Sequence, residues 1–509
     1  MVRRAAAPRK FETQGDLNRY IKGICNILRR DKAKGARLYV AELTWMLYLN
    51  ALDVKEAEEE AMAKAVGASF TPTLEAPYRW RDWAATPDAA GNGEHRASLA
   101  SGAMGEFLAF VNDELFPYLR SLGKKPNATA RQRVTALIFG NKDSTVLESE
   151  TTLLDALDSV DVLGRSEVSQ QHLFTISQAF EGLLPFLGEK KNDGGQFFTP
   201  REVARVMVQV VNPRLGKTVY DPCAGTAGFL IEAYKHLILQ GPAPTELESL
   251  RRDVLWGREY ANEALPITLA NMILHDIETP RIWHGNTLTG VATSDHLWQD
   301  APAQYDYILT NPPFGSKEGK DAQAHFAYKI AKAQVLFLQH IVDSLAPGGT
   351  CGMVIDEGVM FQTITASVQT KRKLLNECDL FCVVSLPKGV FVNAGAGVKT
   401  NILFFKKGQS TERVWYYDLS DRKVNKSNPL TRDDFDDFLY RVALDADDPE
   451  RVSDRSWFVD IDSIKSRTYD LKAINPTAND RSDPRTTSEL LDELKESRDI
   501  METALAAIT

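Results

Sequence analysis

Hydrophobic residues recur every three or four positions through much of the first third of the chain. This spacing runs from residue 15 to 66, returns at 105–122 and occurs again from about 153 to 187. Apolar side chains at that period line one face of a helix, which packs against a core. The pattern therefore predicts an N-terminal helical domain over residues 1–165.

The pattern changes near Gly216, where short apolar runs begin to alternate with helical stretches. Such alternation is typical of an α/β domain with a largely parallel sheet, which we assign to residues 166–420. A long helix is predicted at 326–345, ended by Pro347-Gly348-Gly349. The predicted strands are Thr218–Tyr220, Val254–Glu259, Arg281–His284, Tyr305–Thr310, Thr350–Ile355, Leu380–Leu386 and Asn401–Phe405.

Residues 421–509 are more polar than the sheet region and form a third predicted segment, a C-terminal region. It closes in an amphipathic helical tail at 488–508, with apolar side chains such as Leu490, Leu494 and Leu505. This helix either packs on its own domain or docks a partner, and both alternatives stay open at this point.

Composition is ordinary for a globular protein. Hydrophobic residues make up 43% and charged residues 25% of the 509 positions, and no apolar run is long enough to span a bilayer. The basic first ten residues lack a following apolar segment, so we expect no secretory signal. The five cysteines are scattered without paired metal-ligand spacing, which favours buried thiols in a reducing cytoplasm and predicts no metal site.

The formal net charge of −9 bears on nucleic-acid binding. A protein that holds DNA tightly by itself clusters cations to neutralise phosphates, so this charge disfavours an autonomous DNA binder. It does not exclude DNA as a substrate, provided that a partner supplies much of the contact.

A turn rich in small residues follows the first predicted strand. The strand ends in Asp221, whose carboxylate can accept hydrogen bonds from a cationic ligand, while Gly225 and Gly228 let the backbone approach a ligand closely. The turn lacks the ending of a phosphate loop. The second strand ends in Glu259, placed either to hold a pair of ribose hydroxyls or simply to be solvated. The two strand ends together favour the ribose role.

An aromatic pair lies upstream of the sheet, in the segment Gly194-Gly-Gln-Phe-Phe-Thr-Pro-Arg201. Thr199 is placed to cap a helix that starts at Pro200, since proline is favoured in a first helical turn. Phe197 or Phe198 can lie against a sulfonium ligand, where cation–π attraction contributes. The alternative is that the segment only starts a helix.

The fourth predicted strand runs directly into Asn311-Pro312-Pro313-Phe314. Two prolines fix φ and remove two N–H donors, which leaves backbone carbonyls as unpartnered acceptors. The Asn311 side chain and the Pro312 carbonyl can each accept one N–H from a planar group with an exocyclic NH2, and Phe314 can stack on its ring. The amine lone pair is then available without a strong base. A plain turn is the alternative, which the two strand-end acids disfavour.

In these motifs the chain resembles the DNA-methylating (modification) subunit of type I restriction-modification systems. The resemblance implies a Rossmann-like methyltransferase sheet that uses S-adenosylmethionine (SAM) to methylate the N6 amine of adenine in a specific DNA sequence. It covers most of the chain and is densest from 180 to 405. The shared blocks, in the family's order, are 27–30, 196–201, 221–229, 311–314, 334–340 and 345–349.

The resemblance also implies which residues serve each ligand. The Asn311–Phe314 turn would receive an adenine flipped out of the duplex. Asp221 and Gly225 would shape the cofactor pocket. The residues that would hold the cofactor are Gln196, Phe197, Phe198, Thr199, Pro200, Arg201, Thr226, Ala227, Gly228, Glu259 and Asn286.

Two positions depart from the family's pattern. Asn286 stands where the family usually has aspartate, so it can meet the cofactor's adenine amine only as a neutral acceptor. Asp356 and Glu357 follow the fifth strand, where the family usually has proline, and the sequence gives this acidic pair no role.

No segment after the Asn311 turn is large enough for a domain that reads base edges. This agrees with the family's arrangement, in which a separate specificity subunit reads double-stranded DNA between two modification subunits, with or without a restriction subunit. Two alternatives remain: a methyltransferase for protein glutamine or RNA bases, and a non-catalytic SAM-binding scaffold subunit.

Overall fold

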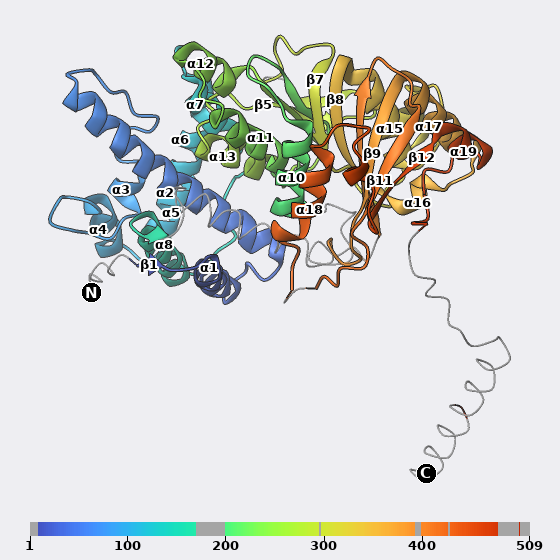
Figure 1. Cartoon of the computed structure of the whole chain (residues 1–509). Coiled ribbons are helices and arrows are strands. Elements are labelled where there is room, and N and C mark those ends of the chain that lie inside the picture. Colours follow the sequence, from blue (N-terminus) through green and yellow to red (C-terminus); the bar gives the residue numbers. More distant parts are fainter. Residues whose placement is uncertain are drawn as a thin grey trace.

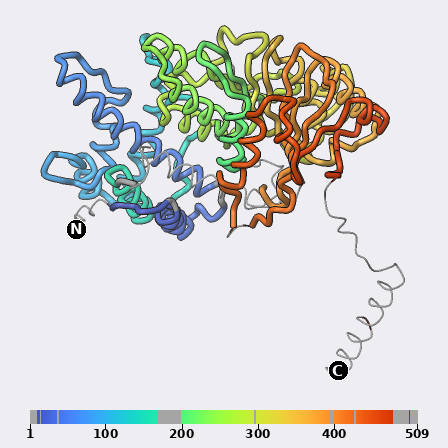
Figure 2. The backbone as a smooth tube through the Cα atoms, in the orientation of Figure 1, coloured from blue at the N-terminus to red at the C-terminus, as the bar shows by residue number. Residues whose placement is uncertain are grey.

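The computed structural model describes residues 9–168, 199–294, 297–391, 399–425, 428–476 and residue 498. Within these ranges the chain forms a helical half, residues 9–168, beside a sheet half that contains the remaining segments (Figure 1). The backbone trace in Figure 2 follows the same two halves in turn. The predicted helical N-terminal domain and the predicted Rossmann-like sheet are both present.

The helical half begins with a well-capped helix. The Thr13 hydroxyl accepts the backbone N–H of Asp16, and the Asp16 carboxylate accepts the N–H of Thr13 in return, so two donors at the helix start are satisfied. The apolar stripe of this helix, including Leu17, Ile21 and Leu28, is fully buried. The helices of this half are α1 (Gln14–Arg29), α2 (Ala36–Ala65), α3 (Trp80–Trp83), α4 (Glu94–Ser101), α5 (Glu106–Ala109), η1 (Phe110–Leu115), α6 (Phe116–Ser121), η2 (Leu122–Lys124), α7 (Ala130–Ile138) and α8 (Glu150–Gly164).

Two short strands, β1 (Lys10–Phe11) and β2 (Glu167–Val168), pair in parallel and join the beginning and end of the helical half. The ten strands of the sheet half form one mixed sheet in the order β12-β11-β9-β10-β8-β7-β3-β4-β5-β6. Their bounds are β3 (Val219–Asp221), β4 (Leu255–Glu259), β5 (Arg281–Asn286), β6 (Val291–Ser294), β7 (Tyr305–Thr310), β8 (Leu345–Asp356), β9 (Cys378–Ser385), β10 (Thr400–Lys407), β11 (Arg413–Asp418) and β12 (Ser456–Asp460).

The sheet order places a topological switch point between β3 and β7. After β3 the chain adds β4 and β5 on one side, then returns to add β7 and β8 on the other, and these neighbouring strands are all parallel. β10 is antiparallel to both of its neighbours, β8 and β9. In open α/β sheets ligands bind beyond the carboxyl ends of the strands at such a switch point, which here means beyond Asp221 and Thr310.

Helices cover both faces of the sheet, and alternate residues of one strand divide between two cores. On β10, Ile402 and Phe404 lie in the core that contains α10 (Arg201–Val211), α11 (Gly228–Ile238) and α13 (Leu265–Leu274). Leu403 and Phe405 lie in the opposite core, with α15 (Ala333–Ser344) and α17 (Thr365–Glu377). This two-residue period is what a strand buried on both faces requires. The smaller helices are α12 (Pro244–Arg252), α14 (Lys320–Ala324), α16 (Glu357–Met360), η5 (Asp433–Phe435), α18 (Asp436–Val442), η6 (Pro449–Arg451) and α19 (Ile461–Ser466).

The structure differs from the sequence prediction at several elements. β6, β11 and β12 were not predicted, and β12 pairs with β11, so the sheet continues past residue 420. The helix predicted from residue 326 begins at Ala333, because the Gln339 amide holds Tyr328 in a loop through both its N–H (3.0 Å) and its carbonyl (2.9 Å). β8 runs through the predicted stop at Pro347-Gly348-Gly349. The tail helix predicted at 488–508 lies outside the described residues, apart from residue 498.

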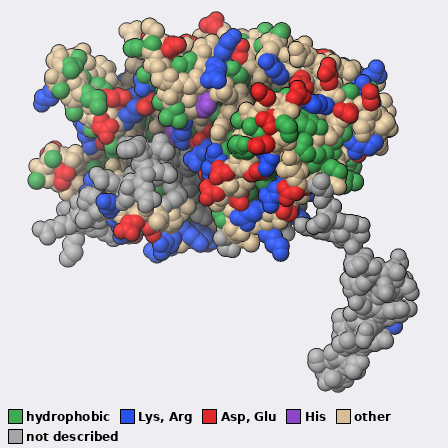
Figure 3. Space-filling view, viewed as in Figure 1, with side chains coloured by type: hydrophobic (Ala, Val, Ile, Leu, Met, Phe, Trp, Pro, Cys, Tyr) green, Lys and Arg blue, Asp and Glu red, His purple; other side chains and the backbone are tan. Residues whose placement is uncertain are grey.

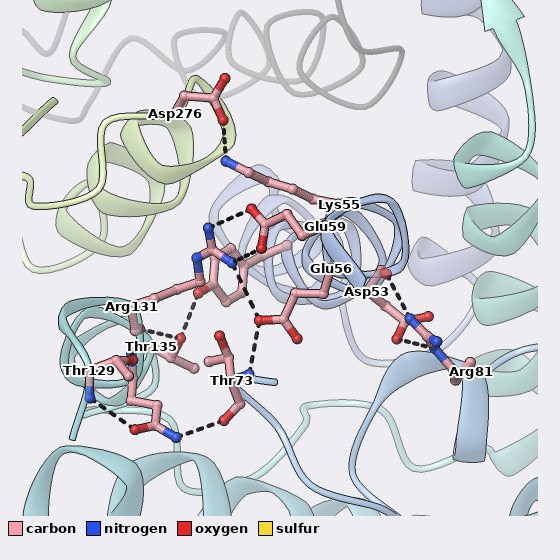
Figure 4. Close-up of polar contacts among 12 residues, drawn as sticks. Asp53, Lys55, Glu56, Glu59, Thr73, Arg81, Thr129, Arg131, Thr135 and Asp276 are labelled. Carbon is pink, nitrogen blue, oxygen red and sulfur yellow. Dashed lines mark hydrogen bonds and ion pairs between the residues drawn. The ribbon is translucent and has the colours of Figure 1, made fainter. Parts of the chain in front are cut away.

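The two halves meet at α13, which packs against α2 and α7 of the helical half. Nine of its ten residues are buried, because it is covered on both sides. An ion pair between Lys55 on α2 and Asp276, just beyond α13, closes the edge of this contact (Figure 4).

Acidic and basic side chains are interspersed over both halves of the face shown in Figure 3. Among the helices in the described part of the chain, none combines the length and the apolar composition that crossing a membrane requires. All five cysteines are free thiols, and Cys378 and Cys382 are buried on β9.

Candidate active site

A hydrogen bond between side chains joins the two strands at the switch point. Thr310 Oγ1, at the end of β7, donates to Asp221 Oδ1, at the end of β3, over 2.7 Å. The same oxygen accepts the N–H of Cys223 at 3.0 Å. Asp221 is 1% exposed and forms no ion pair with any described residue, so burial raises the pKa of its carboxyl to about 7.

The turn from β3 to α11 bends sharply at two left-handed residues, Gly225 (φ 53°) and Ala227 (φ 64°). Among the described residues, a Cβ on Gly225 would meet only the carbonyl oxygen of Cys223, at 3.9 Å, so these residues leave the space in front of this backbone open to a ligand. A left-handed alanine costs about 1–2 kcal/mol, and such strain collects at ligand-binding turns. The turn therefore has the shape that a cofactor cradle requires.

Helix α13 supports this turn from below. Thr268 Oγ1 donates to the carbonyl of Gly225, and Asn271 Nδ2 donates to the carbonyl of Thr226 over 2.7 Å. Thr268 and Asn271 are fully buried. The carbonyls of the turn are thus held by the helix that also contacts the helical half.

Glu259 completes the cradle from the end of β4. Its Oε2 accepts the N–H of Gly225 and its Oε1 accepts the N–H of Ala261, both over 2.7 Å. Each carboxylate oxygen keeps a further lone pair, which suits a pair of hydroxyl donors. No described cation pairs with Glu259, and burial raises its pKa to about 7. The next residue, Tyr260, is 69% exposed and was not singled out from the sequence.

The predicted role of Thr199 as a helix cap is wrong. α10 begins at Arg201 after Pro200, and no side chain caps it. The Thr199 hydroxyl instead accepts Nδ2 of Asn311 over 3.0 Å. Arg201 contacts the start of α11, where its Nη1 donates to the carbonyl of Gly228 over 3.1 Å.

The bond to Thr199 orients the Asn311 amide. With Nδ2 engaged, Oδ1 is the side-chain atom left for a substrate, and this buried oxygen has no hydrogen-bond partner among the described residues. A buried carbonyl without a donor costs about 1–3 kcal/mol, so its retention points to a ligand that supplies the donor. Asn311 therefore fits the predicted role of acceptor for an exocyclic amine.

The Pro312 carbonyl, in contrast, is not the unpartnered acceptor that the sequence predicted. Gln334 Nε2, on α15, donates to it over 3.2 Å, and Gln334 Oε1 accepts the N–H of Asp356 over 3.0 Å. Gln334 is 1% exposed. A carbonyl oxygen has two lone pairs, so one remains for a substrate while the other fixes the turn against α15 and the end of β8.

An aromatic pair closes the turn. Phe314 is 5% exposed and meets Phe391 edge to face, with ring centroids 5.4 Å apart. Pro313 is half-buried beside it. Phe391, from the segment after β9, was not predicted, because nothing in the local sequence signals that it returns to Phe314.

The acidic pair after β8 has a structural role. The Asp356 carboxylate accepts the N–H of Gly358 over 2.7 Å and so caps α16. Glu357 forms ion pairs with Lys399 (3.2 Å) and Lys472 (3.3 Å). These contacts join the end of β8 to β10 and to the chain beyond β12.

The structure therefore brings most of the predicted site together at one edge of the sheet: Thr199, Pro200, Arg201, Asp221, Gly225, Thr226, Ala227, Gly228, Glu259, Asn311, Pro312, Pro313 and Phe314. Asn286 ends the adjacent strand β5. Gln196, Phe197 and Phe198 lie outside the described residues. Among the described residues, the open turn at Gly225 and the two buried carboxylates without a cation fit a ligand with cationic and hydroxyl groups, as SAM has.

Comparison with known proteins agrees with this geometry. Residues 170–483 match the family model of the N-6 DNA methylases, and residues 17–160 match that of the HsdM N-terminal domain. The type I restriction enzyme EcoEI methylase subunit of Escherichia coli is 32% identical over 467 residues, or 90% of this chain and 89% of that protein.

Solved structures show the same relationship. A chain from a study of complex assembly and conformational transition in the type I restriction-modification system is 32% identical, with a TM-score of 0.71 and 98% of both chains covered. A modification subunit from Vibrio vulnificus YJ016 is 30% identical, with a TM-score of 0.73 over 93% of this chain and 99% of that one. The glutamine- or RNA-directed and the non-catalytic alternatives are not favoured. The chain belongs to the N-6 DNA methylase family, as an adenine-specific DNA methyltransferase of the type I modification-subunit kind.

Proposed function

We propose that this methylase takes the methyl group from SAM and performs the transfer at the Asn311–Phe314 turn. The observation that carries the proposal is the buried Oδ1 of Asn311, which has no donor among the described residues although its amide is held in place by Thr199. When bound, SAM supplies an electrophilic methyl group on a sulfonium.

The cofactor site lies over the strand ends of β3 and β4. Asp221 accepts hydrogen bonds from the ammonium of the amino-acid part, and Glu259 accepts the two ribose hydroxyls. The turn of Gly225, Thr226, Ala227 and Gly228 lies along the cofactor, and at Gly225 its backbone approaches without a Cβ between them. What supports these assignments is the open space at Gly225 and the lack of a described cation beside either acid.

The target amine meets two acceptors across the switch point. Asn311 Oδ1 takes one N–H and the free lone pair of the Pro312 carbonyl takes the other, so the nitrogen lone pair turns toward the methyl group. Bound SAM would supply the methyl carbon as the electrophile and keep its sulfur as a neutral thioether, and the methylated amine would lose one proton to solvent. Phe314 contributes a flat face for the base, and the chain lowers the barrier by positioning and electrostatics.

The sequence choice belongs to a partner. We propose that a specificity subunit reads double-stranded DNA and that two copies of this chain flank it, with or without a restriction subunit. The net charge of −9 supports this division, because an excess of acidic over basic residues opposes tight binding to phosphates. In the same scheme residues 1–165 and 421–509 serve assembly, and the helix that the sequence predicts at 488–508 is the docking element. Residues 166–420 carry the chemistry, and the complex works in the cytoplasm.

An Asn311→Ala variant tests the proposed chemistry. The chain, purified together with its specificity subunit, should convert adenine to N6-methyladenine in DNA, measured by mass spectrometry of digested nucleosides. We expect the variant to lose about 10²–10³-fold in kcat, as removal of one preorganised transition-state hydrogen bond typically does. SAM affinity should stay within about threefold, since Asn311 contacts the target and not the cofactor.

Asn127→Ala, at an exposed asparagine of the helical half, serves as the matched control and should behave as wild type. Equal methylation by Asn311→Ala and wild type would overturn the role of Asn311. Methyl label found only in protein or RNA would overturn the function itself.

A further inference from the structure

Three segments of the chain converge at the carboxyl edge of the sheet beside Glu259. They are the turn after β3, the end of β5 and the loop after β7. Thr287 Oγ1 donates to the carbonyl of Pro222 over 2.8 Å, which ties the end of β5 to the turn after β3. Asn286 Nδ2 donates to Glu318 Oε2 over 3.4 Å, which brings in the loop after β7.

The acceptor atom of Asn286 is already engaged by its own turn. Its Oδ1 accepts the backbone N–H of Leu288 at 2.9 Å and that of Thr289 at 3.4 Å. These two bonds fix the amide with Nδ2 directed toward Glu318. Asn286 thus presents a donor at the place where an acceptor for an aromatic amine was expected.

Glu318 is firmly held at this place. Its N–H donates to the carbonyl of Ala331 over 2.7 Å, and its own carbonyl accepts Nε2 of Gln323 over 3.0 Å. The side chain is half-buried, and no ion pair joins it to a lysine, arginine or histidine in the described part of the chain. Burial raises the pKa of the Cys223 thiol in the cofactor turn, and the nearby negative charges of Asp221, Glu259 and Glu318 raise it further. The hydrogen bond from Asn286 therefore places the Glu318 carboxylate at the carboxyl edge of the sheet, near the cofactor turn.

We propose that Glu318, and not Asn286, accepts the exocyclic amine of the cofactor's adenine. A carboxylate only accepts hydrogen bonds, so it recognises a 6-aminopurine and repels a 6-oxopurine, whose oxygen is also an acceptor. Asn286 orients the carboxylate through its Nδ2, as a positioning residue. The inference rests on the proposed function, since it assumes that SAM binds at this edge of the sheet.

The chemistry of the pair accounts for the asparagine at the end of β5. Two carboxylates at the 3.4 Å separation of Asn286 and Glu318 would repel each other, and one would have to take up a proton. An asparagine beside a glutamate avoids that conflict and keeps one acidic acceptor in the pocket.

Equilibrium binding of two demethylated cofactor analogues tests the proposal. S-adenosylhomocysteine carries the 6-amine and S-inosylhomocysteine carries a 6-oxo group at the same position. Isothermal titration with the complete chain should show that wild type prefers the first by at least about tenfold, the usual range for a hydrogen bond to a charged group. Glu318→Gln should bring the preference below about threefold, because its amide can donate to the oxo group.

Two further variants sharpen the result. Asp321→Asn, at an exposed acid of α14 three residues along, should keep the preference of wild type. The double exchange Asn286→Asp with Glu318→Gln returns the carboxylate to the end of β5 and should restore the preference for the amine. Thermal unfolding of each variant reports whether the loop still folds.

The outcomes separate the inference from the proposed function. If wild type binds neither analogue, the SAM site itself is wrong. If wild type prefers the amine and Glu318→Gln keeps that preference undiminished, the site stands and the role of Glu318 is overturned. A loss of preference that the double exchange does not restore would assign Glu318 a specific role but overturn the interchange with Asn286.

Discussion

The helical half and the carboxyl edge of the sheet treat buried acids in opposite ways. In the helical half, Glu56 is paired with Arg131 at 3.4 Å and also accepts the N–H of Thr73 at 2.9 Å (Figure 4). At the sheet edge, Asp221 and Glu259 accept only hydroxyl or backbone N–H groups from the described residues.

The difference shows which polar groups serve the fold and which wait for a ligand. A buried acid with a cation beside it has its charge compensated in the free protein, and losing the cation lowers the free energy of unfolding. An acid buried without a cation lowers stability when it ionises, which is why the pKa values of Asp221 and Glu259 rise to about 7. Such incomplete groups persist where a bound molecule completes them.

Arg131→Met removes the cation that pairs with Glu56 and Glu59, and it should have the largest effect on stability. It leaves Glu56, whose side chain is 5% exposed, and Glu59 without their shared guanidinium. Removing one partner from a largely buried ion pair costs about 3 kcal/mol, so the helical half should unfold at a clearly lower temperature in a calorimetric scan.

Arg133→Met is the matched control, because Arg133 is exposed on the same helix. A further exchange, Glu56→Gln in the Arg131→Met background, should recover part of the loss, since it removes the uncompensated charge. An unfolding temperature equal to that of wild type in Arg131→Met would break the contrast between the two regions.

Glu259→Gln tests the buried carboxylate that has no described cation beside it. The folded pKa of about 7 lies above the ordinary value of 4.5, so ionisation of Glu259 costs stability as pH rises through this window. The free energy of unfolding of the variant, relative to wild type, should therefore improve by about 2 kcal/mol between pH 5 and 8, while SAM binding is lost. Denaturant titration at several pH values measures it, with the exposed Glu58→Gln as control. A difference that stays constant with pH would contradict the unpaired state of Glu259.

The same pKa shift makes cofactor binding depend on pH. The ammonium of SAM prefers the ionised form of Asp221, whose pKa in the free protein is about 7. Affinity should then fall by up to about tenfold as pH drops from 7 to 6, with protons released on binding near neutrality. Titration calorimetry in two buffers of different ionisation enthalpy detects the protons, and Asp221→Asn should weaken the dependence. If the affinity of wild type for SAM did not change with pH, a cation from elsewhere would have to pair with the Asp221 carboxylate.

The smallest expected effect concerns how the catalytic amide is held. Thr199→Val removes the hydroxyl that accepts Nδ2 of Asn311, so the amide loses its fixed orientation. We expect kcat to fall by about five- to tenfold, the equivalent of one hydrogen bond, with KM for SAM unchanged. Thr199→Ser keeps the hydroxyl and should restore kcat. If Thr199→Val lowers SAM affinity and leaves kcat intact, Thr199 serves the cofactor instead.

The sequence was sufficient for features that are local in the chain. Strand ends such as Asp221, Glu259 and Thr310 follow from short apolar runs, and each site motif is a contiguous turn. β12 was missed because it lies in the polar region beyond residue 420, which was predicted to follow the sheet domain. β11 was missed although it lies inside the predicted domain and contains the buried run Val414–Tyr417.

Contacts between distant residues could not be predicted. Thr199 lies 112 positions from Asn311, Gln334 lies 22 from Pro312, and Glu318 lies 32 from Asn286. Each of these side chains is polar and unremarkable in its local sequence, and its partner is set by how the strand ends converge. The corrections at Thr199 and Pro312 share this cause. The local sequence predicted a helix cap at Thr199 and a free carbonyl at Pro312, whereas the folded chain hydrogen-bonds the first to Asn311 and the second to Gln334.

Helix α13 contacts both halves of the molecule. One side of it bears on α2 and α7, and the other holds the carbonyls of Gly225 and Thr226 through Thr268 and Asn271. A subunit that pushed the helical half by a fraction of an ångström would therefore move the cofactor cradle with it. By thermodynamic reciprocity, cofactor bound beside the turn would in turn change the affinity of the helical half for that subunit. Assembly and cofactor binding would then be coupled.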